Sequence, residues 1–336
     1  MTDRAQAIAG FIAANGWQAA TTRPLAGDAS NRRYLRLRMP DGARAVLMDA
    51  PADRGEDVAP FARIARHLSG LGLSAPRILA ADTAQGFLLL EDLGDALFAR
   101  VLEAEPGKET PLYEAATDVL VELHRHPPPA GLDPYSPRVM ADMAALAFDW
   151  YLGGGPVADS PARVAFHSAM HSLLERHAPQ ADVLIQRDYH AENLLWLPDR
   201  AGVARVGLLD FQDAMRGHPA YDLVSVLQDA RRDVPPAIES AMIDRYVAAA
   251  GVDAKAFITA YHCLGAQRNL RILGVFARLC LRDGKAHYVD LIPRVWDLLQ
   301  RDLAHPALQR IAAMVAESLP APEARVLQGL KERCTT

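Results

Sequence analysis

The spacing of hydrophobic residues changes once along this chain, near residue 94. Before that point, residues 34–38 alternate between apolar and polar, and short apolar runs lie at 45–48, 78–80 and 87–90. Alternation with a period of two, bounded by turn residues, predicts strands that pair as hairpins. Short apolar runs bounded by turn residues also predict strands. Apolar residues at helical spacing predict two accompanying helices, at about 1–16 and 58–71. The first part of the chain therefore predicts a small antiparallel sheet.

The remainder of the chain is mostly helical in pattern. Helices are predicted at about 112–123, 138–152, 160–177 and 255–282. Two short apolar runs, 183–185 and 206–209, interrupt them and predict strands. We therefore expect an α+β fold with two lobes, a sheet lobe over 1–93 and a helical lobe over 94–336.

Composition excludes several classes of protein. Half of the 336 residues are hydrophobic and 23% are charged, which is typical of a globular protein. A net charge of -5 argues against a surface dedicated to nucleic acid, and no apolar run reaches the roughly 20 residues of a membrane helix. The three cysteines fit neither a disulfide framework nor a zinc site. We expect a cytoplasmic monomer without nucleic-acid or membrane partners.

One polar constellation carries chemistry. Asp188 and Asn193 lie five positions apart after the first of the two late strands, and Asp210 follows the second. Phosphoryl transfer requires such a set: a carboxylate that orients the attacking hydroxyl, and an amide and a carboxylate that hold Mg²⁺ against the phosphates. Asp188 and Asn193 alone are also consistent with an ordinary loop of Asx turns.

These residues resemble a known family. Arg187-Asp188-x-x-x-x-Asn193 and Leu209-Asp210-Phe211 are similar to the catalytic and metal loops of the aminoglycoside-phosphotransferase and choline-kinase branch of the protein-kinase-like fold. Residues 27–34, 48–51, 87–94, 221–223 and 267–270 further resemble the anomeric sugar kinases of cell-wall recycling. Those enzymes phosphorylate the C1 hydroxyl of N-acetylmuramate and N-acetylglucosamine.

The resemblance implies a bilobal protein-kinase-like fold, ATP and Mg²⁺ as cofactors, and a role for each matching residue. Asp188 would be the catalytic base, and Asn193 and Asp210 would ligate Mg²⁺. Residues that would bind the nucleotide are Gly27, Ser30, Asn31, Arg32, Arg33, Glu91 and Leu93. Residues that would lie in the acceptor site are His190, Asp222, Gln267, Arg268, Asn269 and Arg271. Asp222 also matches a family position that supports the catalytic loop.

Two of these interpretations stay open at this point. The polar residues of 267–271 are equally explained as a solvated or salt-bridged helix face. Asp213 would either bind a second metal ion or support the loop after Asp210.

The chain departs from the family pattern at three positions. Gln186 stands where a histidine is usual, and Gln212 stands where a glycine follows the metal loop. The first 100 residues contain no lysine, although kinases of this fold commonly place one on the third strand. Arg32, Arg33 or Arg44 would have to supply that charge.

The function expected from the resemblance is ATP-dependent phosphorylation of an amino sugar at C1. One alternative is a kinase of another hydroxyl acceptor, such as an aminoglycoside, choline or homoserine. The other is a nucleotide-binding pseudokinase, which the missing lysine and Gln186 favour.

Overall fold

The computed structural model describes residues 2–25, 31–157, 160–179 and 181–334. The chain forms two compact units, Met1–Leu123 with Ala191–Ala214, and His124–His190 with Met215–Thr336. These units differ from the expected lobes, which meet between residues 93 and 94. The expected division into a nucleotide-binding lobe and an acceptor-binding lobe stays a prediction. Among the described residues, no helix combines the length and apolar character that crossing a bilayer requires.

The first unit is built on a five-stranded antiparallel sheet with the order β1-β2-β3-β5-β4. Its strands are β1 (Thr21–Pro24), β2 (Arg33–Arg38), β3 (Arg44–Asp49), β4 (Ile78–Asp82) and β5 (Phe87–Glu91). Its helices are α1 (Thr2–Ala14), α2 (Ala59–Gly70), α3 (Phe98–Ala104) and α4 (Glu109–Leu123). A hairpin of β7 (Leu194–Trp196) and β8 (Val206–Leu208) completes the unit.

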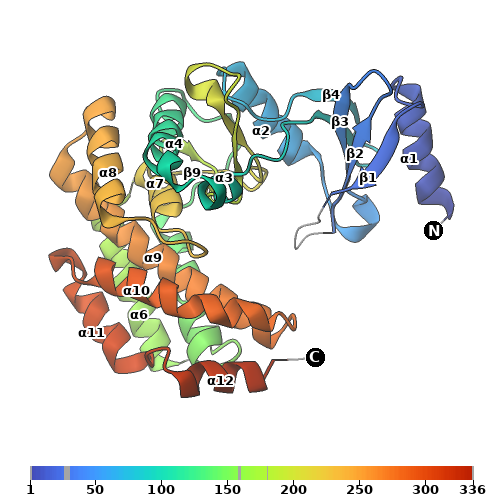
Figure 1. Ribbon diagram of the computed structural model, residues 1–336. Coiled ribbons are helices and arrows are strands. Elements are labelled where there is room, and N and C mark those ends of the chain that lie inside the picture. The colour runs from blue at the N-terminus through green and yellow to red at the C-terminus, as the bar shows by residue number, and fades with distance from the viewer. Residues whose placement is uncertain (1, 26–30, 158–159, 180, 335–336) are drawn as a thin grey trace. The chain divides into compact units, whose positions relative to one another are not determined.

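Helix α1 lies against this sheet (Figure 1). Phe11 and Ile12 of the helix pack with Leu37, Leu47 and Phe87 of the strands in one buried apolar cluster. Apolar side chains at alternate strand positions supply the sheet face of this cluster, so the period-two pattern of the sequence is confirmed.

The second unit is mostly helical. Its helices are α5 (Pro137–Ala144), α6 (Pro161–His177), α7 (Ala220–Leu227), α8 (Pro236–Ala250), α9 (Ala254–Leu281), α10 (Ile292–Leu303), α11 (Gln309–Ser318) and α12 (Ala324–Glu332). Its two strands, β6 (Val183–Ile185) and β9 (Met215–Gly217), pair antiparallel. Short 3₁₀ turns in the chain are Ala52–Arg54, Pro106–Lys108, Gly202–Arg205, Ala286–Leu291 and Pro306–Leu308.

Helix α9 is the central element of the second unit and packs against α5, α6, α7 and α10 (Figure 1). Gly265 and Gly274 allow this close packing. A Cβ atom on Gly265 would stand 2.3 Å from a carboxylate oxygen of Asp302, and one on Gly274 would stand 2.3 Å from the carbonyl carbon of Leu146. Any larger residue at either position would force the helices apart.

The single helix predicted over 138–152 is wrong in one respect. Helix α5 ends at Ala144, and Ala147–Leu152 forms a wider π-helical turn. Asp149 inside this turn is buried, because its carboxylate accepts hydrogen bonds from the Arg163 guanidinium at 2.7 Å and from the Val157 N–H at 3.1 Å. The π-helical turn thus coincides with a buried carboxylate that is paired with Arg163, as a buried charge requires.

Candidate active site

The loop that carries Asp188 follows strand β6 and has a strained backbone. Arg187 has a φ of 73°, in the left-handed region that costs a non-glycine residue about 1–2 kcal/mol. Asp222 on helix α7 accepts the backbone N–H groups of Gln186 at 2.6 Å and Arg187 at 2.9 Å. Ser225, one turn further along α7, donates its hydroxyl to the Arg187 carbonyl at 3.4 Å. Helix α7 thus holds the loop on which Asp188 stands.

Asp222 is completely buried, and burial raises its pKa to about 7. The two backbone N–H donors act in the opposite direction, because both favour the ionised carboxylate. Both carboxylate oxygens are therefore occupied by the protein's own backbone. The sequence-based expectation that Asp222 contacts the acceptor stays a prediction.

Two arginines of helix α9 interact electrostatically with Asp188. Asp188 is half-buried, and its carboxylate interacts electrostatically with Arg268, Arg271 and His190. Burial lowers the pKa of His190 to about 4, so its imidazole is neutral near pH 7. The arginines, rather than His190, therefore balance the charge of Asp188 at that pH.

The polar residues of α9 do not form a solvated face. Gln267, Arg268 and Asn269 are buried, whereas Arg271 is half-buried. Gln267 donates to the Met140 carbonyl at 2.9 Å, and Arg271 donates to the Tyr221 hydroxyl, with the two atoms 3.3 Å apart. The alternative of a solvated helix face is therefore wrong for the three buried residues. Sugar contacts by any of the four stay predictions.

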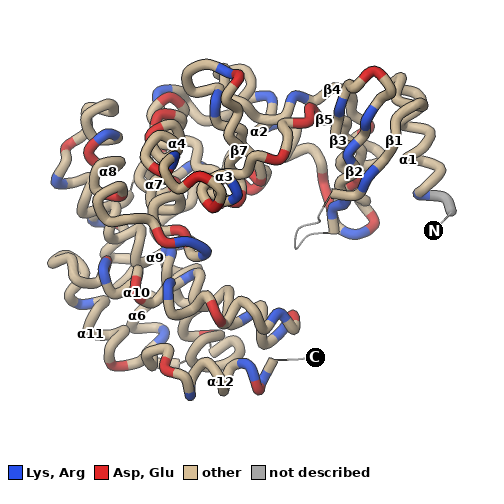
Figure 2. The backbone as a smooth tube through the Cα atoms, viewed as in Figure 1, with Lys and Arg blue, Asp and Glu red and all other residues tan. Residues whose placement is uncertain are grey.

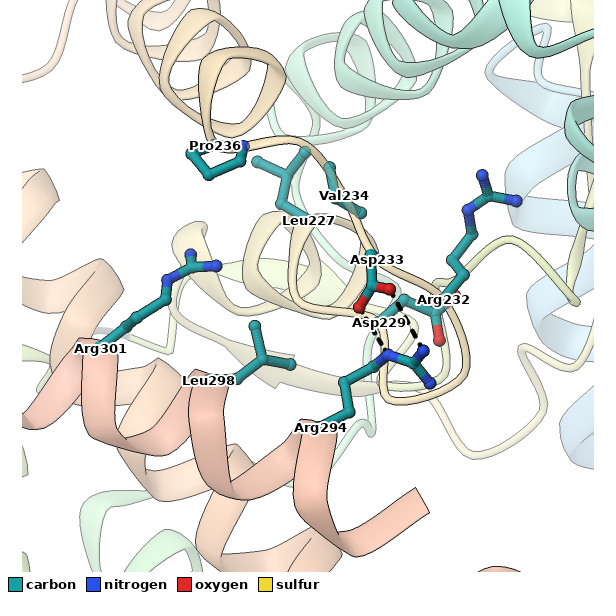
Figure 3. A pocket seen from close by; sticks show the side chains of 9 residues that line it. All are labelled: Leu227, Asp229, Arg232, Asp233, Val234, Pro236, Arg294, Leu298 and Arg301. Atoms are coloured by element: carbon teal, nitrogen blue, oxygen red, sulfur yellow. Dashed lines mark hydrogen bonds and ion pairs between the residues drawn. The ribbon is translucent and has the colours of Figure 1, made fainter. Parts of the chain in front are cut away.

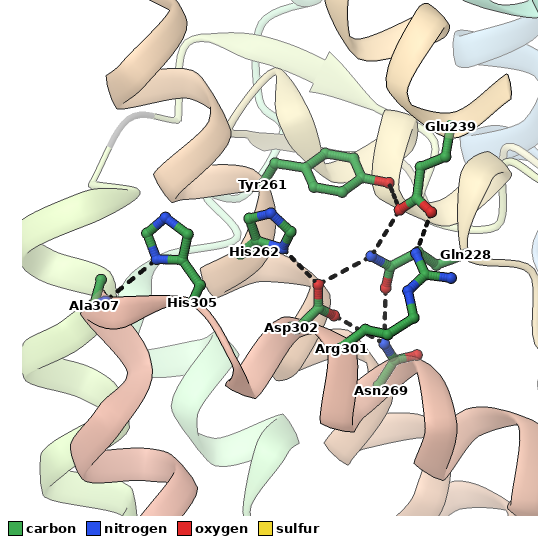
Figure 4. A network of polar contacts seen from close by, with 9 residues as sticks. All are labelled: Gln228, Glu239, Tyr261, His262, Asn269, Arg301, Asp302, His305 and Ala307. Carbon is green, nitrogen blue, oxygen red and sulfur yellow. Dashed lines mark hydrogen bonds and ion pairs between the residues drawn. The ribbon is translucent and has the colours of Figure 1, made fainter. Parts of the chain in front are cut away.

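A buried polar network links α9 to its neighbouring helices (Figure 4). Gln228 bonds to the carboxylates of Asp302 at 3.0 Å and Glu239 at 3.3 Å, and it accepts from Asn269 at 2.8 Å. Arg268 donates to the Gln228 carbonyl at 3.1 Å. Sequence reasoning did not identify Gln228, because its partners Glu239, Asn269 and Asp302 lie on other helices. The network fixes Arg268 close to Asp188.

Asn193 and Asp210 lie together in the first unit, at the open end of the β7–β8 hairpin. Asn193 comes directly before β7, and Asp210 comes shortly after β8. The amide of Asn193 stands 3.5 Å from an Asp210 carboxylate oxygen, and Gln212 donates to the other oxygen at 2.7 Å. Asp210 has a φ of 56°, and among the described residues only Arg187 shares a positive φ without being glycine. Strain of this kind concentrates at functional sites.

This pair suits a hard divalent cation. An amide oxygen and a carboxylate oxygen are ligands that Mg²⁺ takes when substrate phosphates and water supply the rest. The Asn193 amide nitrogen is the atom that faces Asp210 here, so the amide would turn over to present its oxygen to a metal ion. The described residues contain no cluster of three acidic, histidine or cysteine side chains that would enclose a metal on its own.

The predicted nucleotide loop is partly described. Gly27 and Ser30 lie outside the described residues. Arg32 forms an ion pair with Glu56 at 2.7 Å, and both side chains are largely buried. The Asn31 backbone N–H also donates to Glu56, at 3.0 Å. Figure 2 shows the basic positions along strand β2. Arg33, the first residue of this strand, forms an ion pair with the buried Asp49.

Strand β5 ends at Glu91, and Leu93 follows it two residues later. Glu91 accepts from Arg200 at 2.8 Å and pairs with Arg77 at 3.1 Å. The Leu93 side chain lies over Gly207 of β8, and a Cβ on that glycine would approach it to 3.2 Å. Among the residues that the structure describes, none accepts a hydrogen bond from the Leu93 backbone N–H.

Residues 21–264 match the phosphotransferase enzyme family. A curated N-acetylmuramate/N-acetylglucosamine kinase from Caulobacter vibrioides is 41% identical, over 95% of this chain and 98% of its own. The chain belongs to the phosphotransferase enzyme family. A kinase of the same name from Pseudomonas aeruginosa is 35% identical, over 92% of this chain and 93% of its own.

Solved structures of the phosphotransferase enzyme family share this fold. The GDP complex of an aminoglycoside 2'-phosphotransferase has a TM-score of 0.61 at 16% identity, covering 93% of this chain and 99% of its own. A choline kinase from Streptococcus pneumoniae has a TM-score of 0.56 at 12% identity, with the same two coverages. The α+β kinase-like fold and the family resemblance predicted from the sequence are therefore confirmed.

Proposed function

We propose that this protein is an ATP-dependent kinase that phosphorylates the C1 hydroxyl of N-acetylmuramate, N-acetylglucosamine or both, in peptidoglycan recycling. The observation that carries the proposal is identity of 41% across nearly the whole chain with a curated kinase of these two sugars. The loop that carries Asp188 also supports it. Its left-handed residue Arg187 is held by Asp222, and backbone strain of this kind concentrates at functional sites.

Asp188 orients the anomeric hydroxyl and accepts its proton as the γ-phosphoryl group transfers. The transition state of phosphoryl transfer is loose, so positioning and charge neutralisation supply most of the rate. An anomeric hydroxyl is more acidic than an ordinary alcohol, which suits a carboxylate base. Arg268 and Arg271 interact electrostatically with that carboxylate.

Asn193 and Asp210 would hold the divalent metal, for which we propose Mg²⁺. The chemistry that Mg²⁺ would supply there is neutralisation of the charge that develops on the phosphates during transfer. Gln212, through its 2.7 Å hydrogen bond, fixes the Asp210 carboxylate. The glutamine at this family glycine position therefore gains a role as an orienting group.

The nucleotide would lie against the sheet of the first unit. Its phosphates would meet the loop that runs from Gly27 and Ser30 to Asn31 and Arg32, with Arg33 beyond it. The Leu93 backbone N–H, which has no hydrogen-bond acceptor among the described residues, would donate to the adenine ring. Arg32 replaces the missing strand lysine in this scheme, because it has a carboxylate partner in Glu56, as that lysine usually does.

The acceptor would bind in the second unit, beside the residues of α9 that face Asp188. Arginine-rich surroundings suit an acidic sugar better than a polycationic aminoglycoside. A nucleotide-binding pseudokinase is the second candidate, and the lack of any lysine before residue 100 favours it.

One experiment separates these functions. The protein is incubated with ATP, Mg²⁺ and a panel of free N-acetylmuramate, N-acetylglucosamine, kanamycin, choline and homoserine. The proposal predicts ADP release with the two amino sugars, and phosphorus NMR showing the new ester at C1. ADP release with another acceptor, or ATP binding without turnover on any of them, would overturn it.

A further inference from the structure

A cavity of about 210 Å³ opens in the second unit between residues 227–236 and helix α10 (Figure 3). Its apolar wall consists of Leu227, Val234, Pro236 and Leu298. Its polar wall consists of Asp229, Asp233, Arg232, Arg294 and Arg301. Sites for drug-sized ligands usually measure about 300–1,000 Å³, so this cavity fits a substituent of a sugar rather than a whole nucleotide.

Asp229 provides an acceptor that the protein leaves unused. Its side chain is 2% exposed, and one carboxylate oxygen accepts the Arg231 backbone N–H at 2.8 Å. The other oxygen is buried and has no hydrogen-bond donor among the described residues. Buried acceptors without a donor are rare in proteins, and a ligand hydroxyl would satisfy this one.

Arg294 provides a donor in the same cavity. Its Nε and Nη2 atoms bind the two oxygens of Asp233 at 2.7 and 3.3 Å, which fixes the plane of the guanidinium. In the described part of the chain, nothing accepts a hydrogen bond from Nη1. Arg294 also interacts electrostatically with Asp229, so the unused donor and the unused acceptor belong to one site.

The other two arginines are less suited to a ligand. Arg301 pairs with Glu239 of α8. The Arg232 guanidinium points away from the group formed by Asp229, Asp233 and Arg294 in Figure 3. Arg294 is thus the cation directed at the cavity.

The cavity also belongs to the surroundings of the proposed base. His190 interacts electrostatically with both Asp229 and Asp188. Arg268 interacts electrostatically with the same two carboxylates and donates to the carbonyl of Gln228, the residue before Asp229, at 3.1 Å. We therefore place the sugar with its C1 hydroxyl at Asp188 and its other substituents toward Asp229.

We propose that this cavity is the subsite for the 3-O-lactyl group of N-acetylmuramate, an inference that rests on the proposed function. Arg294 pairs with the lactyl carboxylate, and Asp229 accepts a hydrogen bond from a hydroxyl of the sugar ring. The lactyl methyl group packs on Leu298 and Val234. N-acetylglucosamine has the same ring without the lactyl group, so Arg294 distinguishes the two sugars and Asp229 serves both.

The test compares kcat/KM for the two sugars in wild-type protein and in variants. We expect Arg294→Gln to lower kcat/KM for N-acetylmuramate about tenfold to a hundredfold, the range for a lost hydrogen bond to a charged group, and to lower that for N-acetylglucosamine at least fivefold less. Arg294→Lys keeps the positive charge but loses the planar guanidinium. Its kcat/KM for N-acetylmuramate should lie between those of wild type and Arg294→Gln. Asp229→Asn should lower both values by similar factors. Arg282→Gln breaks a comparable surface ion pair elsewhere and should change neither.

The outcomes are distinguishable. Equal effects of Arg294→Gln on both sugars, or none on either, would overturn the subsite and leave the proposed function standing. An Asp229→Asn variant with wild-type kinetics would also overturn it. Wild-type protein that phosphorylates neither sugar would overturn the proposed function, and the subsite with it.

Discussion

Asp222 and Arg187 are joined by a 2.9 Å hydrogen bond in which a fully buried carboxylate accepts the backbone N–H of a residue at a φ of 73°. The neighbouring Gln186 N–H donates to the other carboxylate oxygen at 2.6 Å. A left-handed conformation at a non-glycine residue persists only where its surroundings enforce it. The position of Asp188, the next residue, therefore depends on α7.

Replacing Asp222 with asparagine tests this dependence. One of the two N–H donors would then face a side-chain NH₂ group rather than an acceptor. We expect the free energy of unfolding to fall by about 2–3 kcal/mol, and kcat to fall with it. Thermal or denaturant unfolding together with steady-state kinetics would measure both. Ser225→Ala, which removes only a long hydrogen bond to the same loop, should cost less than about 1 kcal/mol.

His218 makes the stability of α7 dependent on pH. Its Nδ1 accepts the backbone N–H of Ala220 at the start of the helix, and burial lowers its pKa to about 4. Between pH 6.5 and about 4 the unfolded chain binds a proton that the native imidazole does not. The contribution of His218 is therefore complete above pH 6.5, and as much as about 3 kcal/mol is lost as the pH falls through that window.

The comparison of wild type with His218→Asn isolates this contribution. Asparagine also accepts a helix-capping hydrogen bond but does not titrate. The unfolding free energy of the variant should therefore fall less steeply than that of wild type between pH 6.5 and 4. Asp222, whose pKa burial raises to about 7, acts in the opposite direction in both proteins, because the native state gains its proton first as the pH falls. Parallel curves for the two proteins would show that His218 does not carry the effect.

The sequence predicted most of the fold, for reasons that particular elements make clear, whereas the roles of the site residues stay predictions. The strand around Leu37 alternates apolar and polar residues because only one of its faces is buried, so its pattern is local. The spacing of Asp188 and Asn193 is also local, and together with Asp210 it predicts phosphoryl transfer. Gln228 and Arg294 gave no such signal, because their partners come from other helices and no spacing along the chain records the contacts.

Arg32 tests how the chain works without the usual lysine. If Arg32 neutralises the phosphates, Arg32→Gln should raise KM for ATP about tenfold. The same change leaves Glu56 largely buried without its partner, which should lower the free energy of unfolding by up to about 3 kcal/mol. The double variant Arg32→Gln, Glu56→Gln should recover stability without recovering KM. Arg23→Gln on the exposed strand β1 is the control, and an unchanged KM in Arg32→Gln would assign the phosphate charge elsewhere.

Asp210 and Gln212 are expected to differ in their effect on metal dependence. Asp210→Asn removes a proposed ligand, and the Mg²⁺ concentration for half-maximal activity should rise more than about 100-fold. Gln212→Ala removes only the group that orients this ligand, which typically costs about tenfold. Activity titrated against Mg²⁺ measures both, and equal effects of the two changes would contradict the division of roles.

Asp188→Asn tests the central claim most directly, through turnover of N-acetylmuramate and N-acetylglucosamine measured beside the affinity for ATP. The account predicts that turnover of both sugars falls at least about a thousandfold, while ATP binding stays within about threefold of wild type, because Asp188 acts on the acceptor hydroxyl. A variant that retains turnover, or that loses ATP binding to the same degree, would contradict the assignment of Asp188 as the base.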